Sequence, residues 1–389
     1  MYADKEYIIA IRRELHRNPE IGFDLDDTVA LVKRELESLG VECTEKYARS
    51  SVVATIGRAD APLTIGIRAD MDALPITEKS GLPFSSEREG AMHACGHDAH
   101  TAMLLGTAKA LKAMENDLAC KVMLIFQPSE EGIVSGACEL VAGGLMDDVD
   151  VIIGLHVENW LESGTVGVCS GASMASSRSF RVDFYGKSAH ATLPHSGADA
   201  LAALVRCYSD LQCTVARLIN PFSKYVLSIG RIDGGTTQNV IADKAYMLGT
   251  LRTFDMSVDA LITEKLEEIA SASASAFGCR AEVTTSLKAT VLYNDPALSE
   301  AVLSSARRIV GEEGIVRMPE KLSSEDFSQY LSKKPGVFFR LGTRNEAKGI
   351  TSLPHNSDFM IDEDALPIGT DTCVQFVLDN MNGIKPARM

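Results

Sequence analysis

The sequence predicts an α/β protein with a mostly parallel sheet, into which a smaller ferredoxin-like α+β domain is inserted. At 389 residues the chain exceeds one ordinary hydrophobic core, which predicts two domains. Apolar runs alternate with amphipathic helical patterns up to about residue 175 and again after about residue 295. Between these parts, apolar and polar residues alternate within each run, as they do in strands buried on one side.

The first part of the chain favours a sheet that helices cover on both faces. Ile8, Ile11 and Leu15 give an N-terminal helix one apolar face. Further helices are expected over 25–39 and 101–114, and apolar strands over 51–57, 63–69, 121–126 and 149–155. Continuous apolar strands that alternate with helices are typical of a parallel sheet buried on both sides.

Residues 178–290 predict a separate domain with the element order β-α-β-β-α-β, which is the ferredoxin-like layout. The first pattern returns after this segment, with a helix over 297–310, a strand over 336–342 and a closing helix over 363–380. We therefore expect residues 1–177 and 291–389 to form one α/β domain that residues 178–290 interrupt.

Composition excludes several classes of protein. The 38 basic and 53 acidic residues give a net charge of −15, so nucleic acid is not an expected partner. No stretch approaches the roughly 20 apolar residues of a membrane span, and the charged start predicts an amphipathic helix instead of a signal peptide. Nine scattered cysteines without a CxxC pair indicate a reduced, cytoplasmic chain without a disulfide framework.

Chemically active side chains follow the predicted strands at the points where the strands end. Asp70 and Asp72 follow one strand, Glu130 and Glu131 another, and His156 a third, while His355 lies in the loop after the strand over 336–342. Cys95 and His97 end a loop directly before a helix. Ligands bind beyond the carboxyl ends of strands in open α/β sheets, so a shared site is expected there.

Thiol, imidazole and carboxylate groups are the ligands of zinc and its first-row neighbours. The candidates extend from Cys95 to His355 and include carboxylates, which favours a catalytic site with open positions over a closed structural zinc site. The alternative is that Cys95 is a core thiol and the histidines are helix caps. The residue types alone leave zinc, manganese, cobalt and nickel open.

The adjacent pair Glu130 and Glu131 indicates hydrolytic chemistry. One carboxylate can bind a metal while its neighbour stays free as a general base beside a metal-bound water. The alternative is a solvated acidic loop, but the position directly after an apolar strand and before Gly132 disfavours it.

Ten segments together resemble peptidase family M20, and specifically its aminoacylase-like amidohydrolases. That subfamily includes hippurate hydrolases, N-acetyl-diaminopimelate deacetylases and plant auxin–amino acid conjugate hydrolases. The segments run almost end to end in the expected order and are LHRNPEIGF (15–23), RADMDALPI (68–76), MHACGHDAHTAMLLG (92–106), FQPSEEG (126–132), GLHVENW (154–160), GKSAHATLPHSGADA (186–200), GGTTQNVIAD (234–243), GTLRTF (249–254), SSEDF (323–327) and LPHNSDF (353–359).

The resemblance implies two divalent metal ions per subunit, with Zn, Mn, Co or Ni as candidates. The implied ligands are Cys95, His97, Glu131, His156 and His355. The implied reaction splits the amide bond of an N-acyl amino acid, with an N-acetyl, N-benzoyl or similar acyl group, into a carboxylic acid and a free amino acid.

The resemblance also assigns roles to residues outside the ligand set. Glu130 would be the general base that activates the metal-bound water, and His190 would stabilise the transition state. Asn239 and Arg252 would hold the substrate, through its carboxylate. The inserted domain would be a lid and dimerisation domain, so a homodimer or higher homo-oligomer is expected.

One departure from the wider family concerns Asp70 and Asp72, because many members carry His-x-Asp there with the histidine on a metal. We expect Asp72 to orient a ligand and leave the role of Asp70 open. Ser323 with Asp326 fits a capping box, which predicts that Glu325 and Asp326 only cap a helix. The roles of Asp98, His93 and His100 also stay open.

Two further functions compete with the amidohydrolase. A metallo-dipeptidase or aminopeptidase would act on a free amino terminus. A non-catalytic metal- or ligand-binding protein could use the same scaffold, but it has no need of an unligated base such as Glu130.

Overall fold

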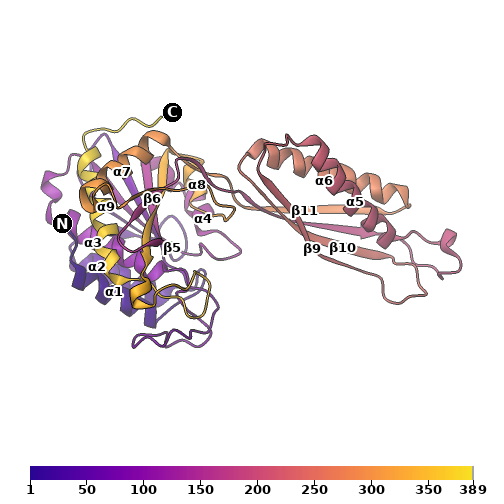
Figure 1. Ribbon diagram of the computed structural model, residues 1–389, viewed down its shortest axis with the longest axis horizontal. Coiled ribbons are helices and arrows are strands. Elements are labelled where there is room, and N and C mark those ends of the chain that lie inside the picture. The colour runs from indigo at the N-terminus through magenta and orange to yellow at the C-terminus, as the bar shows by residue number, and fades with distance from the viewer. Residues whose placement is uncertain (388–389) are drawn as a thin grey trace. The chain divides into compact units, whose positions relative to one another are not determined.

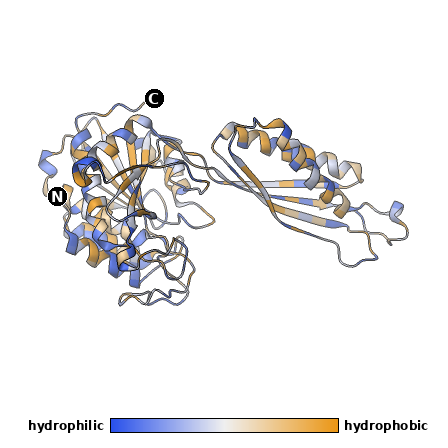
Figure 2. Cartoon of the chain, viewed as in Figure 1, coloured by the Kyte–Doolittle hydropathy of each residue, from blue (hydrophilic) through white to orange (hydrophobic). Residues whose placement is uncertain are grey.

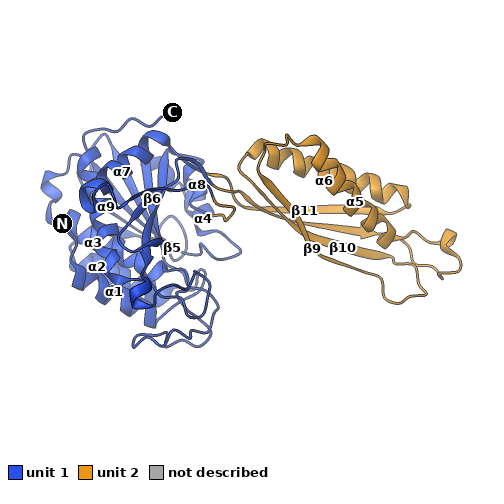
Figure 3. Cartoon of the chain, viewed as in Figure 1, with its two compact units in different colours: residues 1–173, 293–320, 325–389 blue, residues 174–292, 321–324 orange. Residues whose placement is uncertain are grey.

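The computed structural model describes residues 1–387 and divides the chain into two compact units. The first unit comprises Met1–Ser173, Tyr293–Glu320 and Glu325–Met389, and the second comprises Met174–Leu292 and Lys321–Ser324 (Figure 3). The expected α/β class with a large, mostly parallel sheet is confirmed.

The first unit is built on one eight-stranded sheet. Its strands, in spatial order, are β1 (Cys43–Thr44), β2 (Val52–Gly57), β4 (Lys121–Gln127), β3 (Thr64–Asp70), β5 (Val151–Glu162), β14 (Gly336–Arg344), β6 (Val166–Val168) and β13 (Ile315–Arg317). The four central strands β4, β3, β5 and β14 run parallel to one another. Strands β1, β2 and β4 pair antiparallel at one side of the sheet.

Two groups of helices pack against this sheet. The larger group comprises α1 (Lys5–Arg17), α2 (Asp26–Ser38), α3 (His97–Ala113), α7 (Pro296–Val310) and α9 (Leu366–Asn380), which share the main hydrophobic core (Figure 1). The smaller group comprises α4 (Gly136–Ala142) and α8 (Ser328–Leu331), which pack on each other. Helix α3 is buried over almost its whole length, so it forms the centre of the larger layer.

Strand β5 shows how the sheet directs side chains to its two faces. Val151, Ile153 and Leu155 belong to the core under the larger helix layer. Side chains alternate along a strand, so His156 points to the opposite face. There its ring lies 6.3 Å from the ring of Phe338, measured between centroids.

The second unit has the element order β-α-β-β-α-β. Its elements are β8 (Ser177–Tyr185), α5 (Ala200–Leu218), β9 (Tyr225–Gly234), β10 (Lys244–Thr253), α6 (Met256–Ala276) and β11 (Arg280–Ala289). The sheet is antiparallel with the strand order β11-β8-β10-β9. Both helices carry hydrophobic and hydrophilic residues, and the hydrophobic ones pack on the sheet (Figure 2).

In the part of the chain that the structure describes, no helix is both long enough and apolar enough to cross a membrane.

Helices α1, α3 and α9 meet at Gly106. A Cβ atom at this position would lie 2.7 Å from Ile8 Cγ1 and 3.2 Å from Thr370 Oγ1, closer than side-chain atoms pack. We expect Gly106→Val to lower the free energy of unfolding by about 1–3 kcal/mol, because the added atoms overpack the core. Thermal unfolding measures the loss, and Gly230→Ala is the control because its Cβ meets no atom within 4 Å. An unchanged midpoint for Gly106→Val would contradict this packing.

Candidate metal centre

The four central strands deliver most of the predicted site residues. Asp70 is the last residue of β3, and Glu130 and Glu131 lie in the loop that follows β4. His156 lies within β5, and His355 lies in the loop after β14. These strands are neighbours and run parallel, so their carboxyl ends meet at one edge of the sheet.

The N-terminus of α3 brings Cys95 and His97 to the same edge. Gly96 lies between them with φ +84°, a left-handed conformation that glycine adopts without strain. A Cβ at Gly96 would lie 2.4 Å from Val157 Cγ2, so only glycine allows this close approach to β5. Gly96 therefore fixes the distance between the α3 start and the strand that carries His156.

The five predicted ligands come together in the structure. Cys95 Sγ lies 3.3 Å from His156 Nε2, and His355 Nε2 lies 2.9 Å from Glu131 Oε1. Three overlapping groups have their donor atoms within 4.8 Å of one another, namely Cys95 with His97 and His156, Cys95 with Glu131 and His355, and His97 with Glu130 and Glu131. Residues far apart in the sequence thus form one cluster of metal-ligand atoms.

The tautomer of His156 suits a metal ligand. Its Nδ1 lies 2.5 Å from the carbonyl oxygen of Val157, which can only accept, so Nδ1 carries the proton. The lone pair on Nε2 then faces Cys95. Burial lowers the pKa of His156 and raises the pKa of Cys95, so both groups are neutral here without a cation. A divalent ion would stabilise the thiolate that ligation requires.

The surroundings of the His97 ring also fit a bound cation. Its ring is buried, and among the described residues neither ring nitrogen has a hydrogen-bond partner. Nδ1 lies 3.4 Å from Asp72 Oδ1 and Nε2 lies 3.6 Å from Asp70 Oδ2, both long for hydrogen bonds. Buried polar atoms are nearly always paired in folded proteins, so this residue fits the metal that the family resemblance implies.

His100 is excluded as a ligand because both of its ring nitrogens are engaged. Nδ1 donates to Asp70 Oδ1 at 2.6 Å, and Nε2 accepts from the backbone N–H of Val157 at 2.9 Å. This bond ties the start of α3 to β5. Asp98 is also turned away from the cluster, because its Oδ2 accepts from Arg12 Nε at 2.8 Å and lies 2.7 Å from His16 Nδ1.

Asp72 holds the loop that carries the two glutamates. Its Oδ1 accepts from the backbone N–H of Glu130 at 2.9 Å, and its Oδ2 accepts from that of Glu131 at 3.0 Å. Ser129, directly before Glu130 in this loop, has φ +51°, which is rare for a residue with a side chain. Such strain costs about 1–3 kcal/mol and persists only where surrounding contacts fix it.

Glu130 is buried beside other acids, with 7% of its surface exposed. Burial raises the pKa of Glu130 well above its usual range, and the nearby charges of Glu325 and Glu131 raise it further. One carboxylate oxygen each of Glu130, Glu325 and Asp326 lies within 4.8 Å of the other two. Burial also raises the pKa of Glu325, to about 7.

A buried arginine that the sequence analysis missed organises these acids. Arg68 Nη1 donates to Asp70 Oδ2 at 2.7 Å, and Nη2 donates to Glu325 Oε1 and Asp326 Oδ1, both at 3.1 Å. Arg68 Nε donates to Gln127 Oε1 at 2.8 Å. A charged residue inside the otherwise apolar strand over 63–69 was the signal that could have revealed it.

The expectation that Glu325 and Asp326 only cap a helix is wrong, although Glu325 Oε1 also accepts from the backbone N–H of Phe327 at 3.2 Å. Helix α8 begins only at Ser328, after an N-cap residue that makes no side-chain cap bond. Besides Arg68, Asp326 accepts from Ser135 Oγ at 2.6 Å and from Gln127 Nε2 at 2.9 Å. The two acids therefore hold β3, β4 and α4 together under the cluster.

His190, Asn239 and Arg252 all belong to the second unit. His190 is exposed, and its Nδ1 accepts from the backbone N–H of Thr192 at 3.2 Å. The backbone N–H of Ala191 donates to the carbonyl of Asn239 at 3.0 Å, so His190 and Asn239 lie on adjoining segments. Arg252 lies on β10 and donates to Thr250 Oγ1 at 2.7 Å. Their catalytic roles stay predictions.

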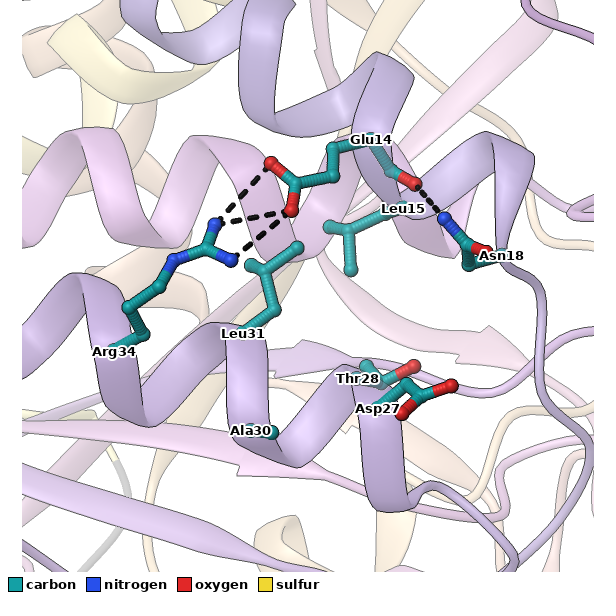
Figure 4. Close-up of a pocket in the computed structure, with 8 residues that line it drawn as sticks. All are labelled: Glu14, Leu15, Asn18, Asp27, Thr28, Ala30, Leu31 and Arg34. Atoms are coloured by element: carbon teal, nitrogen blue, oxygen red, sulfur yellow. Dashed lines mark hydrogen bonds and ion pairs between the residues drawn. The ribbon is translucent and has the colours of Figure 1, made fainter.

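A hollow of about 350 Å³ lies between α1 and α2 but shares no residue with the metal-ligand cluster. Figure 4 shows the Arg34 guanidinium reaching across it to Glu14, with a shortest distance of 3.1 Å. The pair is exposed, and such pairs contribute little to stability.

The fold and the ligand cluster are typical of a metal-dependent hydrolase. Comparison with known proteins identifies the family. Residues 66–379 match the model of peptidase family M20/M25/M40, so the chain belongs to this family. Thermostable carboxypeptidase 2 of Saccharolobus solfataricus is 37% identical over 371 residues, which cover 94% of this chain and 93% of the relative. N-acetyl-L-cysteine deacetylase of Bacillus subtilis is 37% identical over 363 residues, covering 93% and 85%.

A solved structure supports the same assignment. A dinuclear metal binding peptidase of the M20 family from Bacillus subtilis aligns with a TM-score of 0.84 and 33% identity, covering 98% of this chain and 99% of that chain. The expected family is therefore confirmed.

Asp72→Asn should weaken metal binding without unfolding the protein. The amide can place only one oxygen against the two backbone N–H groups, so the loop with Glu130 and Glu131 loses one of its two anchors. We expect metal affinity to fall on the order of 10- to 100-fold, as is typical for residues that orient ligands. Metal titration measures the change, and Asp60→Asn is the control because Asp60 is exposed and pairs with Arg58 outside the ligand cluster. Equal affinities in both variants would contradict the role.

Proposed function

We propose that this protein is a metal-dependent amidohydrolase that cleaves N-acyl amino acids into a carboxylic acid and a free amino acid. The observation that carries the proposal is a buried carboxylate, Glu130, set beside a cluster of thiol, imidazole and carboxylate ligand atoms. The 37% identical deacetylase of N-acetyl-L-cysteine supports this substrate class.

Two divalent ions per subunit are proposed at this cluster, held by Cys95, His97, Glu131, His156 and His355. When bound, they supply an acidified water and polarise the scissile carbonyl. The mixed thiolate, imidazole and carboxylate set suits Zn, Co, Ni or Mn.

Glu130 is proposed as the general base. Burial and the neighbouring acids raise the pKa of Glu130, which makes its carboxylate a stronger base than an exposed one. The carboxylate would take a proton from the attacking water and then deliver it to the departing amine nitrogen. Asp72 would assist because its side chain accepts a hydrogen bond from the backbone N–H of Glu130 and so fixes the position of that residue.

Residues of the second unit are proposed to recognise the substrate. His190 would donate to the oxyanion, an interaction worth on the order of 3 kcal/mol for a well-placed donor. Asn239 and Arg252 would hold the substrate carboxylate, because a guanidinium binds a carboxylate through two parallel hydrogen bonds. We propose that this unit, predicted as residues 178–290 and compact over Met174–Leu292, is a lid and dimerisation domain of a homo-oligomer.

A metallopeptidase is the second candidate, and the similarity to a thermostable carboxypeptidase favours it over the non-catalytic alternative. A carboxypeptidase and an N-acyl amino acid hydrolase both split the amide bond that precedes an amino acid with a free carboxylate. The proposed role of Arg252 suits both. A dipeptidase or aminopeptidase would in addition need a site for the free amino group.

A substrate panel with metal analysis tests the proposal. N-acetyl, N-benzoyl and indole-acetyl amino acids would be compared with unblocked dipeptides after loading with Zn²⁺, Mn²⁺, Co²⁺ or Ni²⁺. The proposal expects faster release of amino acid from the blocked substrates. Faster cleavage of the unblocked dipeptides would establish the peptidase instead, and no turnover with full metal loading would revive the binding protein.

Glu130→Gln should retain metal and lose turnover. The amide cannot accept the proton of the attacking water, so we expect kcat to fall on the order of 10²- to 10⁴-fold. Elemental analysis and initial rates on the best N-acyl substrate measure both quantities. Cys95→Ala is the matched contrast, because it should lower metal content. Turnover by Glu130→Gln at the parent rate would remove Glu130 from the mechanism.

A further inference from the structure

The side chain of Asn159 joins the strand of His156 to the loop of His355. Asn159 lies on β5 with no exposed surface. Its Nδ2 donates to the carbonyl oxygens of Ser352 and Met360, both at 2.7 Å. Its Oδ1 accepts from Thr343 Oγ1 on β14 at 2.5 Å. Both donors and the acceptor of this amide are therefore in use.

The two carbonyls belong to opposite ends of the same loop. Ser352 precedes His355 by three residues, and Met360 follows it by five. One amide group thus fixes both ends of the segment that presents this predicted ligand. Thr343 in turn fixes the amide, and its hydroxyl group is buried in the sheet.

His355 depends on such support because its own contacts are few. Its backbone has φ +67°, a left-handed conformation that side chains disfavour. Its imidazole is half exposed, at 53%, so packing alone does not orient the ring. Its backbone N–H donates to the carbonyl of Ala94 at 2.8 Å, which holds the middle of the loop next to Cys95.

We propose that Asn159 is a positioning residue that acts through His355, by holding the loop in the form that brings His355 Nε2 to Glu131. The expected effect on metal binding rests on the proposed function. The contacts of Asn159 are seen in the structure and do not depend on that function. Without the amide, the two loop ends lose their common anchor, and the strained backbone at His355 can relax. An ion held in part by His355 would then bind more weakly than it does in the parent protein.

A second buried asparagine provides a matched control. Asn294 also has no exposed surface, and its Nδ2 donates to the carbonyls of Cys169 and Phe338 at 2.8 and 3.0 Å. Its Oδ1 accepts from the backbone N–H of Phe338 at 2.8 Å. Asn294 therefore makes the same kind of contacts beside the same strand, β14, without touching the loop of a predicted ligand.

The experiment titrates metal-free protein with Zn²⁺ or Mn²⁺ and compares the parent with Asn159→Ala, Asn294→Ala, His355→Ala and the double variant Asn159→Ala/His355→Ala. We expect Asn159→Ala to lower the affinity of one of the two ions on the order of 10- to 100-fold and Asn294→Ala to leave both affinities unchanged. The double variant should bind no more weakly than His355→Ala, because Asn159 acts through that residue.

Hydrogen exchange of the metal-free proteins separates this inference from the proposed function. Backbone amides of 352–360 should exchange faster in Asn159→Ala than in the parent. A parent protein that binds no divalent ion overturns the proposed function, and unchanged exchange in Asn159→Ala overturns the loop anchor by itself. Metal affinity equal to the parent's in Asn159→Ala, or equal losses in Asn159→Ala and Asn294→Ala, also overturns the proposal.

Thr343→Val covers the case in which Asn159→Ala does not fold. It replaces the hydroxyl that donates to Asn159 Oδ1 with a methyl group of similar size. A smaller loss of the same ion's affinity supports the proposal, and parent affinity together with parent exchange rates overturns it.

Discussion

The buried guanidinium of Arg68 is the contact on which the rest of the centre depends. It meets three carboxylates, those of Asp70, Glu325 and Asp326, at 2.7–3.1 Å. Glu130 adds a fourth acid nearby, and the buried Arg340, which acts on Asp70 and Glu325, is a second positive charge, so the acids still outnumber the arginines. The surplus of negative charge lies beneath the ligand cluster. It favours binding of cations there, and it adds to burial, which is the larger cause, in raising the pKa of Glu130 and Glu325.

The arrangement also explains how buried polar contacts fix this edge of the sheet. Asp326 connects Gln127 at the end of β4 with Ser135 at the start of α4. Asp72 fixes the backbone of the two glutamates, and His100 connects Asp70 to β5. Strained backbone remains where the loops present functional groups. Rigid surroundings are what allow such strain to persist.

The mechanism proposed for this protein applies with little change to an N-acyl amino acid and to a peptide with a free carboxylate. The proposed base Glu130 and the proposed ligand cluster would act on the amide bond that both share. The two kinds of substrate differ on the acyl side of that bond, away from the carboxylate that Asn239 and Arg252 are proposed to hold. Specificity between these substrates is therefore expected to come from pocket shape, where each extra methylene changes binding by only about 1–3 kcal/mol.

The sequence by itself determined the family, the α/β class, the five candidate ligands and the neighbouring glutamate, because these follow from local patterns and short motifs. Tertiary structure alone decided what surrounds them. Arg68, Glu325 and Asp326 meet only after residues some 250 positions apart fold together, so local spacing made the two acids look like helix caps. The sequence also did not predict that β2 pairs antiparallel or that Asn159 anchors the His355 loop. Strand direction and side-chain hydrogen bonds depend on which segments become neighbours in space.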